Sequence, residues 1–149
     1  MQIFNQNKKA YFNYIILEKL EAGLVLNGQE VKSIKQGRAS IDGSYVFLKK
    51  EEPYLINSNI PAYQPKNAPF NYNPKRERKI LLNKKEINYL IGKTKEKRLT
   101  LIPLKIYNKN GRIKLELGIV KGKKKTDKRE DIKKRDDQRE IERAKKLWG

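Results

Sequence analysis

The stretch Glu-Val-Lys at positions 30–32 holds the residues whose types and spacing come nearest to catalytic chemistry. In one class of nucleases, an acidic residue followed two positions later by lysine holds a metal ion with an upstream acid, and here Glu18 and Glu21 lie upstream. Glu30 also stands three residues after Asn27, which is the spacing of a capping box at a helix start. We therefore expect Glu30 to cap a helix, and we predict neither enzymatic activity nor a metal or other cofactor.

The chain contains no histidine and no cysteine. Histidine is the commonest general base and zinc ligand of proteins, and cysteine supplies thiolate nucleophiles, disulfides and further metal sites. Their absence excludes most templates of catalysis and any disulfide framework.

Basic residues dominate the composition and indicate a different kind of chemistry. The 149 residues include 36 lysines and arginines against 17 acidic residues, a formal net charge of +19. Residues 1–120 contain 23 basic and 10 acidic residues, and the remainder contains 13 and 7. A single charged run is often only solvated surface, but an excess spread over the whole chain indicates a polyanionic partner. We predict contacts with nucleic-acid phosphates from the basic clusters at 75–79, 93–98 and 121–125.

Three stretches have the apolar pattern and the turn residues of antiparallel strands. Residues 11–26 are expected to form two strands around a bend at Glu-Ala-Gly, and residues 44–60 a hairpin with a charged turn. Residues 99–119 are expected to form a second hairpin around Asn110 and Gly111, a pair that tolerates the positive φ angles of a type I′ turn.

Two short helices are predicted between these strands. Each begins with an asparagine that is followed three residues later by a glutamate, at Asn27 and Glu30 and again at Asn83 and Glu86. Together the elements predict a mainly β fold, a small closed antiparallel OB-like barrel of about six strands with two or three short helices. Barrels of this kind bind single-stranded or irregular nucleic acid on one face.

The C-terminal residues are too charged to bury a core of their own. We therefore divide the chain into an RNA-binding barrel, residues 1–120, and a basic tail, residues 121–149. No apolar run approaches the roughly 20 residues of a membrane-spanning helix, and the N-terminal residues lack the order of a signal peptide. We expect a soluble, cytoplasmic protein without a membrane partner.

Several stretches together resemble the SsrA-binding protein (SmpB) family, which accompanies transfer-messenger RNA (tmRNA) in bacteria. The resemblance runs in register from about Asn7 to Arg143, and its most specific parts are EAG-x-V-L-x-G-x-EVKS and GKK-x-x-DKR. It implies an OB-like barrel without enzymatic activity that holds the tRNA-like domain of tmRNA and delivers it to stalled ribosomes for trans-translation. It also implies a tail that is disordered alone and becomes helical in the empty decoding site and message channel, where rRNA phosphates neutralise its charge.

The resemblance assigns RNA-acceptor contacts to four residues of the barrel. Each has a simpler alternative: Glu30 and Asn83 cap helices, Leu81 packs in the core, and Lys114 lies on the polar face of a strand. The two roles are compatible, because a capping residue at an exposed helix start can place the positive end of the helix against a phosphate.

In the tail, the resemblance assigns ribosome contacts to six residues: Lys121, Lys123, Lys124, Asp127, Lys128 and Arg129. Family members often carry an aromatic residue or histidine just before the Asp-Lys-Arg triplet, where this chain has Thr126, so the resemblance does not extend to stacking at that position. Beyond residue 130 a narrow apolar stripe predicts a helix that is marginal without a partner, formed by Ile141, Ala144, Leu147 and Trp148.

The expected partners are tmRNA and the ribosome, with the protein a monomer when free. Two alternatives remain at this level. An OB-type ribosomal or rRNA-binding structural protein would share the charge and the fold but would have no preference for tmRNA. A metal-dependent nuclease would cleave RNA when given magnesium.

Overall fold

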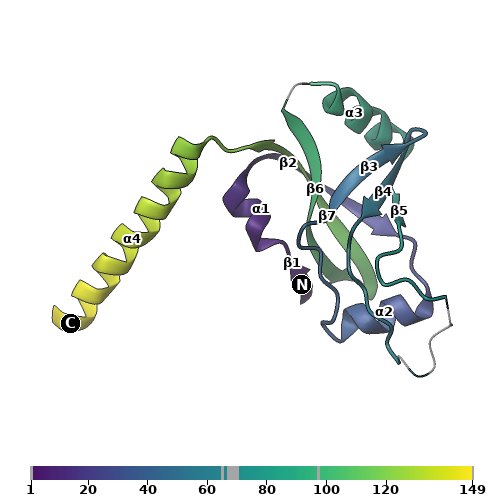
Figure 1. The fold of residues 1–149 in the computed structure, drawn as a ribbon, viewed down its shortest axis with the longest axis horizontal. Helices are drawn as coiled ribbons and strands as arrows, with labels where there is room; N and C mark the ends of the chain where they lie inside the picture. Colours follow the sequence, from purple (N-terminus) through teal and green to yellow (C-terminus); the bar gives the residue numbers. More distant parts are fainter. Residues whose placement is uncertain (1, 65, 67–70, 97, 149) are drawn as a thin grey trace.

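The computed structural model describes residues 2–64, 66, 71–96 and 98–148, and the side chains of all these except residues 125–127, 140 and 144–148. Within these residues, seven strands form one antiparallel sheet in the order β1-β6-β7-β2-β5-β4-β3, and Figure 1 shows how the helices lie relative to it. The strands are β1 Gln2–Gln6, β2 Tyr14–Leu24, β3 Tyr45–Lys49, β4 Glu52–Ile56, β5 Arg78–Leu81, β6 Leu99–Lys109 and β7 Arg112–Gly122. The helices are α1 Lys8–Asn13, α2 Gly28–Lys35, α3 Lys84–Thr94 and α4 Lys125–Trp148.

Both predicted hairpins are confirmed, and local turn geometry explains them. Asn110 and Gly111 join β6 to β7 with φ angles of 52° and 78°, as a type I′ turn requires. Lys50 and Glu51 join β3 to β4 with φ angles of 51° and 64°. Each turn therefore twists in the sense that keeps its two strands paired.

The expected bend in residues 11–26 is wrong, because β2 runs through Glu-Ala-Gly as one strand. It pairs with β7 from Tyr14 to Gly23, with a single irregularity in register between Ile16 and Glu18. Ala22 points into the core, and Glu21 on the opposite face accepts a hydrogen bond from the Tyr107 hydroxyl at 2.5 Å. Glu21 of the expected bend therefore lies on the outer face of a continuous strand.

The sheet is not closed, which corrects the expectation of a closed barrel. The end strands β1 and β3 share no backbone ladder in the described part of the chain, although β3 packs beside β6. At the open edge, a side-chain contact joins β1 to the segment before β3: Oδ1 of Asn5 accepts a hydrogen bond from the backbone N–H of Ile41 at 2.9 Å. Strand β1 pairs with β6 and stops where Asn7 caps α1, and β3 pairs with β4, so each end strand is paired on one edge only.

Two apolar clusters lie on the two faces of this sheet. The larger fills the concave interior and includes Ile34 of α2 and Leu90 of α3, so these helices are held by the core. The smaller lies on the outer face, where Ala10 of α1 packs on Leu104 and Val120. Helix α1 is thereby fixed between the sheet and α4 (Figure 1).

Replacing Gly118 with alanine is expected to lower the free energy of unfolding by about 1–3 kcal/mol, because overpacking a core strains it. A Cβ at this position would lie 2.9 Å from Cδ1 of Leu104, a fully buried side chain. Gly122→Ala in the same strand is the matched control, since nothing lies within 4 Å of a Cβ there. Urea unfolding measures both variants, and equal losses would contradict the close contact.

Helix α4 projects away from the sheet and meets the rest of the molecule at α1 (Figure 1). It begins at Lys125, which is earlier than the predicted helix beyond residue 130. Ile132 and Ile141 are 47% and 50% exposed, so these apolar residues are not packed. The other members of the predicted stripe, Ala144, Leu147 and Trp148, have side chains outside the described part. Among the described residues, no helix is both long and apolar enough to cross a membrane.

Candidate nucleic-acid interface

A groove of about 360 Å³ lies where the ends of β2 and β5 meet α2 and the β6–β7 turn. Apolar side chains form much of its wall, and three cationic side chains stand around it. Its lining residues are Gly23, Leu24, Leu26, Val31, Lys35, Leu81, Gly111, Arg112, Ile113 and Lys114. This combination suits a nucleotide chain, because bases and sugars can contact the apolar wall while phosphates meet the cations.

Leu81 and Lys114, two of the predicted RNA contacts, lie together in this groove. Gly23 of β2 pairs with Leu81 on one side and with Lys114 on the other, so it brings the two residues to one place. A Cβ at position 23 would lie only 3.3 Å from Cβ of Leu81, and the glycine therefore lets the leucine lie close across the strand. Leu81 is 50% exposed, which rules out the alternative of a core position.

Asn83 follows two residues later and caps α3, as predicted. Its Oδ1 accepts the backbone N–H of Glu86 at 2.8 Å, and the Glu86 carboxylate accepts the Asn83 N–H at 3.1 Å. The asparagine is exposed. Its capping role is thus confirmed, and its contact with RNA stays a prediction.

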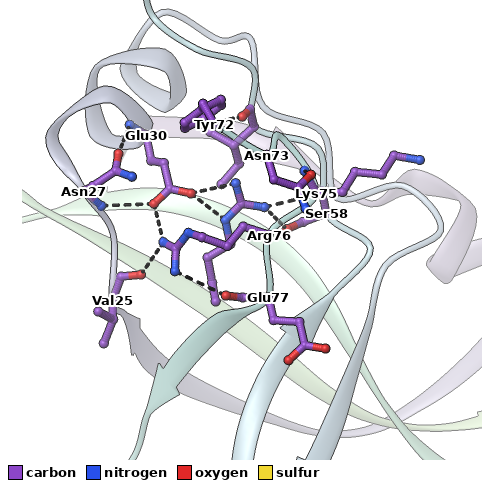
Figure 2. Close-up of polar contacts among 11 residues, drawn as sticks. Val25, Asn27, Glu30, Ser58, Tyr72, Asn73, Lys75, Arg76 and Glu77 are labelled. Carbon is purple, nitrogen blue, oxygen red and sulfur yellow. Dashed lines mark hydrogen bonds and ion pairs between the residues drawn. The ribbon is translucent and has the colours of Figure 1, made fainter. Parts of the chain in front are cut away.

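Glu30 also caps its helix, but its carboxylate is fully buried. Figure 2 shows the surrounding network: Oε1 accepts the Asn27 N–H at 3.0 Å and Nη2 of Arg76 at 2.5 Å. The other oxygen, Oε2, accepts Nε of Arg78 at 2.6 Å. Arg78 is fully buried too and donates to Oγ of Ser58 at 3.1 Å. The carboxylate is therefore enclosed by two guanidinium groups.

These contacts keep Glu30 ionised and occupy both of its oxygens. Burial raises the pKa of the Glu30 carboxyl, but hydrogen bonds from the two guanidinium groups and a backbone N–H outweigh burial, so the pKa lies below its ordinary value. A metal ion would have to displace the arginines, so the nuclease pattern at positions 30–32 finds no support here. In the described residues, no group of three or more potential metal-ligating side chains is placed to hold an ion.

The basic cluster at 75–79 is divided by the fold. The prediction of a phosphate contact is wrong for Arg78, whose side chain is fully buried, whereas the side chain of Arg76 is 42% exposed. The sequence held one signal: Arg78 stands two positions before the buried Ile80, and residues two apart share a strand face. The role of Arg76 in this network could not be read from the sequence.

The predicted ribosome-contacting residues begin on β7 and continue into α4. Lys121 is half-buried in the sheet, and Nζ of Lys123 contacts the Asp131 carboxylate and donates to the Tyr11 carbonyl at 3.3 Å. The other described members are exposed or half-buried on the last connection and the first turns of α4: Lys124, Lys128 and Arg129. The Asp127 side chain lies outside the described part. A ribosomal role for this set stays a prediction.

Two contacts that the sequence did not predict hold the first turns of α4, one to α1 and one to Lys123, the residue after β7. The guanidinium carbon of Arg135 lies 4.9 Å from the ring centre of Phe12, within the range of a cation–π interaction. Asp131, one turn earlier, pairs with Lys123. The first turns of α4 are therefore held by charged side chains and one aromatic ring.

Comparison with known proteins gives consistent results. A family model described as SmpB protein matches residues 4–147. The SsrA-binding protein of Geobacillus kaustophilus is 54% identical over 143 residues, which cover 96% of this chain and 92% of that relative. The SsrA-binding protein of Thermosynechococcus vestitus is 47% identical over 146 residues, covering 98% and 96%. A solved chain described as "tmRNA-SmpB: a journey to the center of the bacterial ribosome" has a TM-score of 0.66 and 45% identity, with 80% of this chain and 84% of that chain covered.

Proposed function

The chain belongs to the SmpB protein family, and we propose that it binds the tRNA-like domain of tmRNA and delivers it to stalled ribosomes for trans-translation. Its relatives are named SsrA-binding proteins, and the similar solved chain belongs to a tmRNA-SmpB structure on the bacterial ribosome. The protein acts by binding and positioning RNA, and its expected location is the cytoplasm.

The groove at Leu81 and Lys114 is the observation that carries this proposal. It places an exposed leucine and three cations on one side of a curled antiparallel sheet, the arrangement by which OB-type folds bind irregular nucleic acid. Asn83 stands beside it at the N-terminus of α3, where backbone N–H groups favour a phosphate. The Glu30 carboxylate is fully buried, so in this proposal Glu30 contributes to RNA binding by holding Arg76 and Arg78 in place.

The tail has a separate task in this proposal. Residues 1–120 bind the tRNA-like domain, and residues 121–149 occupy the empty decoding site and message channel. The described apolar residues of α4 are exposed, so rRNA is the proposed source of the contacts that stabilise this helix on the ribosome. Lys121, Lys123, Lys124, Asp127, Lys128 and Arg129 make these contacts.

Replacing Lys114 with glutamine is expected to weaken binding of the tRNA-like domain about five- to tenfold, because one phosphate contact is lost. The salt slope, the fall of log affinity with log salt concentration, should decrease by about one. Lys50→Gln on the exposed β3–β4 turn is the matched control, since it removes the same charge outside the groove. Fluorescence anisotropy at several salt concentrations measures both, and equal losses of affinity would contradict a specific groove.

A further inference from the structure

The network of ion pairs around Glu30 has one uncompensated positive charge. Glu30 and Arg78 are both fully buried and form an ion pair at 2.6 Å, so their charges compensate each other. Arg76 brings a second guanidinium to the same carboxylate at 2.5 Å. The three groups therefore carry a net charge of +1.

The excess charge lies at the surface. The side chain of Arg76 is 42% exposed, and Glu30 is the only carboxylate with which it forms an ion pair among the described residues. The neighbouring Glu77 offers its backbone carbonyl to Nη1 at 3.3 Å (Figure 2), while its carboxylate pairs with Lys49 at 3.8 Å. An external anion at Arg76 would complete the charge balance of the buried pair.

Arg76 is also held in place before any ligand arrives. Its Nη2 donates to Glu30 and, at 3.5 Å, to the carbonyl of Val25, and Nη1 donates to Glu77. These three attachment points come from the residue after β2, from α2 and from the residue next to Arg76, so the guanidinium loses little further freedom when it binds. Both Nη2 protons are used in these contacts and Nε is buried, so one N–H of Nη1 remains for an anion, at low entropic cost.

We propose that Arg76 binds a backbone phosphate of the RNA that lies in the groove, with Glu30 as the residue that positions it. This inference rests on the proposed function. Val25, whose carbonyl holds Arg76, is followed directly by Leu26 of the groove wall and is itself 44% exposed. Similarly, Glu30 is followed by Val31 of the same wall. A strand leaving the groove at this end therefore passes Arg76.

The test is binding of the full-length protein to the isolated tRNA-like domain of tmRNA at salt concentrations between about 50 and 200 mM. Arg76→Gln leaves Arg78 to neutralise Glu30, and we expect about five- to tenfold weaker binding with a salt slope reduced by about one. Arg76→Lys keeps the charge but loses the fixed guanidinium N–H, so its slope should equal that of the wild type while its affinity is lower. Arg38→Gln is the control, since Arg38 is an exposed arginine whose guanidinium donates to the Tyr63 carbonyl at 3.0 Å, and it should bind within about twofold of the wild type.

The outcomes separate this inference from the proposed function. A wild-type protein with no preference for the tRNA-like domain over an unrelated RNA of equal length would overturn the function itself. If the wild type has that preference, unchanged affinity and slope in Arg76→Gln overturn the role of Arg76. Weaker binding at an unchanged slope also overturns it, because the loss would then be structural. Should Arg76→Gln unfold, Arg76→Lys decides: reduced affinity at an unchanged slope and with wild-type stability in urea supports the contact, whereas wild-type affinity, or a loss of affinity that accompanies a loss of stability, refutes it.

Discussion

Glu30→Ala is expected to destabilise the protein by about 3–5 kcal/mol, because removing one partner of a buried ion pair leaves an uncompensated buried charge. Arg78 is fully buried, and its Nε and Nη2 both face the Glu30 carboxylate at 2.6 Å. The variant also loses half of the capping box with Asn27. Urea unfolding monitored by circular dichroism measures the change.

The second capping box of the chain supplies the control. Glu86 occupies the same position of α3, caps Asn83 at 3.1 Å and lies outside the buried network, in a capping box whose hydrogen bonds are exposed. Glu86→Ala should cost only about 0.5–1 kcal/mol, as expected for a lost cap. If the two variants lost equal stability, the ion pair would have no special role.

The ion pair between Glu30 and Arg78 makes the stability loss of Glu30→Ala depend on pH. Because the folded pKa of Glu30 is lowered, its contribution is complete above the ordinary glutamate pKa of about 4.3 and is lost as the pH falls through the folded value. Glu30→Ala lacks this contribution at every pH. The difference in unfolding free energy between the wild type and the variant should therefore be constant near neutral pH and narrow in acid.

Truncation after Lys124 is expected to abolish peptide tagging on stalled ribosomes while affinity for the tRNA-like domain stays within about threefold of the wild type. The cut preserves all pairs of β7 to Gly122 and the bond from the Lys123 N–H to the Asn13 carbonyl at 3.0 Å. The deleted residues 125–149 include ten basic and seven acidic residues, so the truncated chain keeps most of the net positive charge that attracts RNA. A reconstituted translation system with a message that lacks a stop codon measures tagging.

A second variant separates the shape of the tail from its charge. A full-length chain with residues 125–149 in shuffled order keeps the composition but loses the spacing of the basic residues. It should also fail to support tagging. Tagging by the shuffled tail would reduce the tail to a generic basic tether, and loss of RNA binding in the truncated chain would contradict the division between the two parts.

Sequence signals predicted the parts of the fold that depend on a few neighbouring residues. The capping boxes at Asn27 and Asn83 and the turn at Asn110 were identified because each satisfies its own backbone groups locally. Strands β1 and β5 were missed because they are short and are strands only through pairing with distant partners, β6 for one and β2 and β4 for the other. The open edge between β1 and β3 likewise depends on pairing across the whole chain.

Of the candidate site, the sequence also predicted one part and missed another. The pattern that pointed to Leu81 and Lys114 came from resemblance, and the register of β2 with its two neighbours explains why these distant residues meet. The burial of Glu30 could not be predicted, since a carboxylate at a helix start is usually exposed. It follows only from the two arginines that the fold brings to it, which lie 46 and 48 residues further along the chain.

The most direct measurement of the central claim is the identity of the RNA that copurifies with the tagged, full-length protein from its own cells. The account predicts that tmRNA is the most enriched species after a wash at moderate salt, and that its enrichment falls in the Lys114→Gln protein and stays unchanged in Lys50→Gln. Copurification of ribosomal RNA in equal amount with the protein, without enrichment of tmRNA, would contradict the account and indicate a permanent ribosomal constituent.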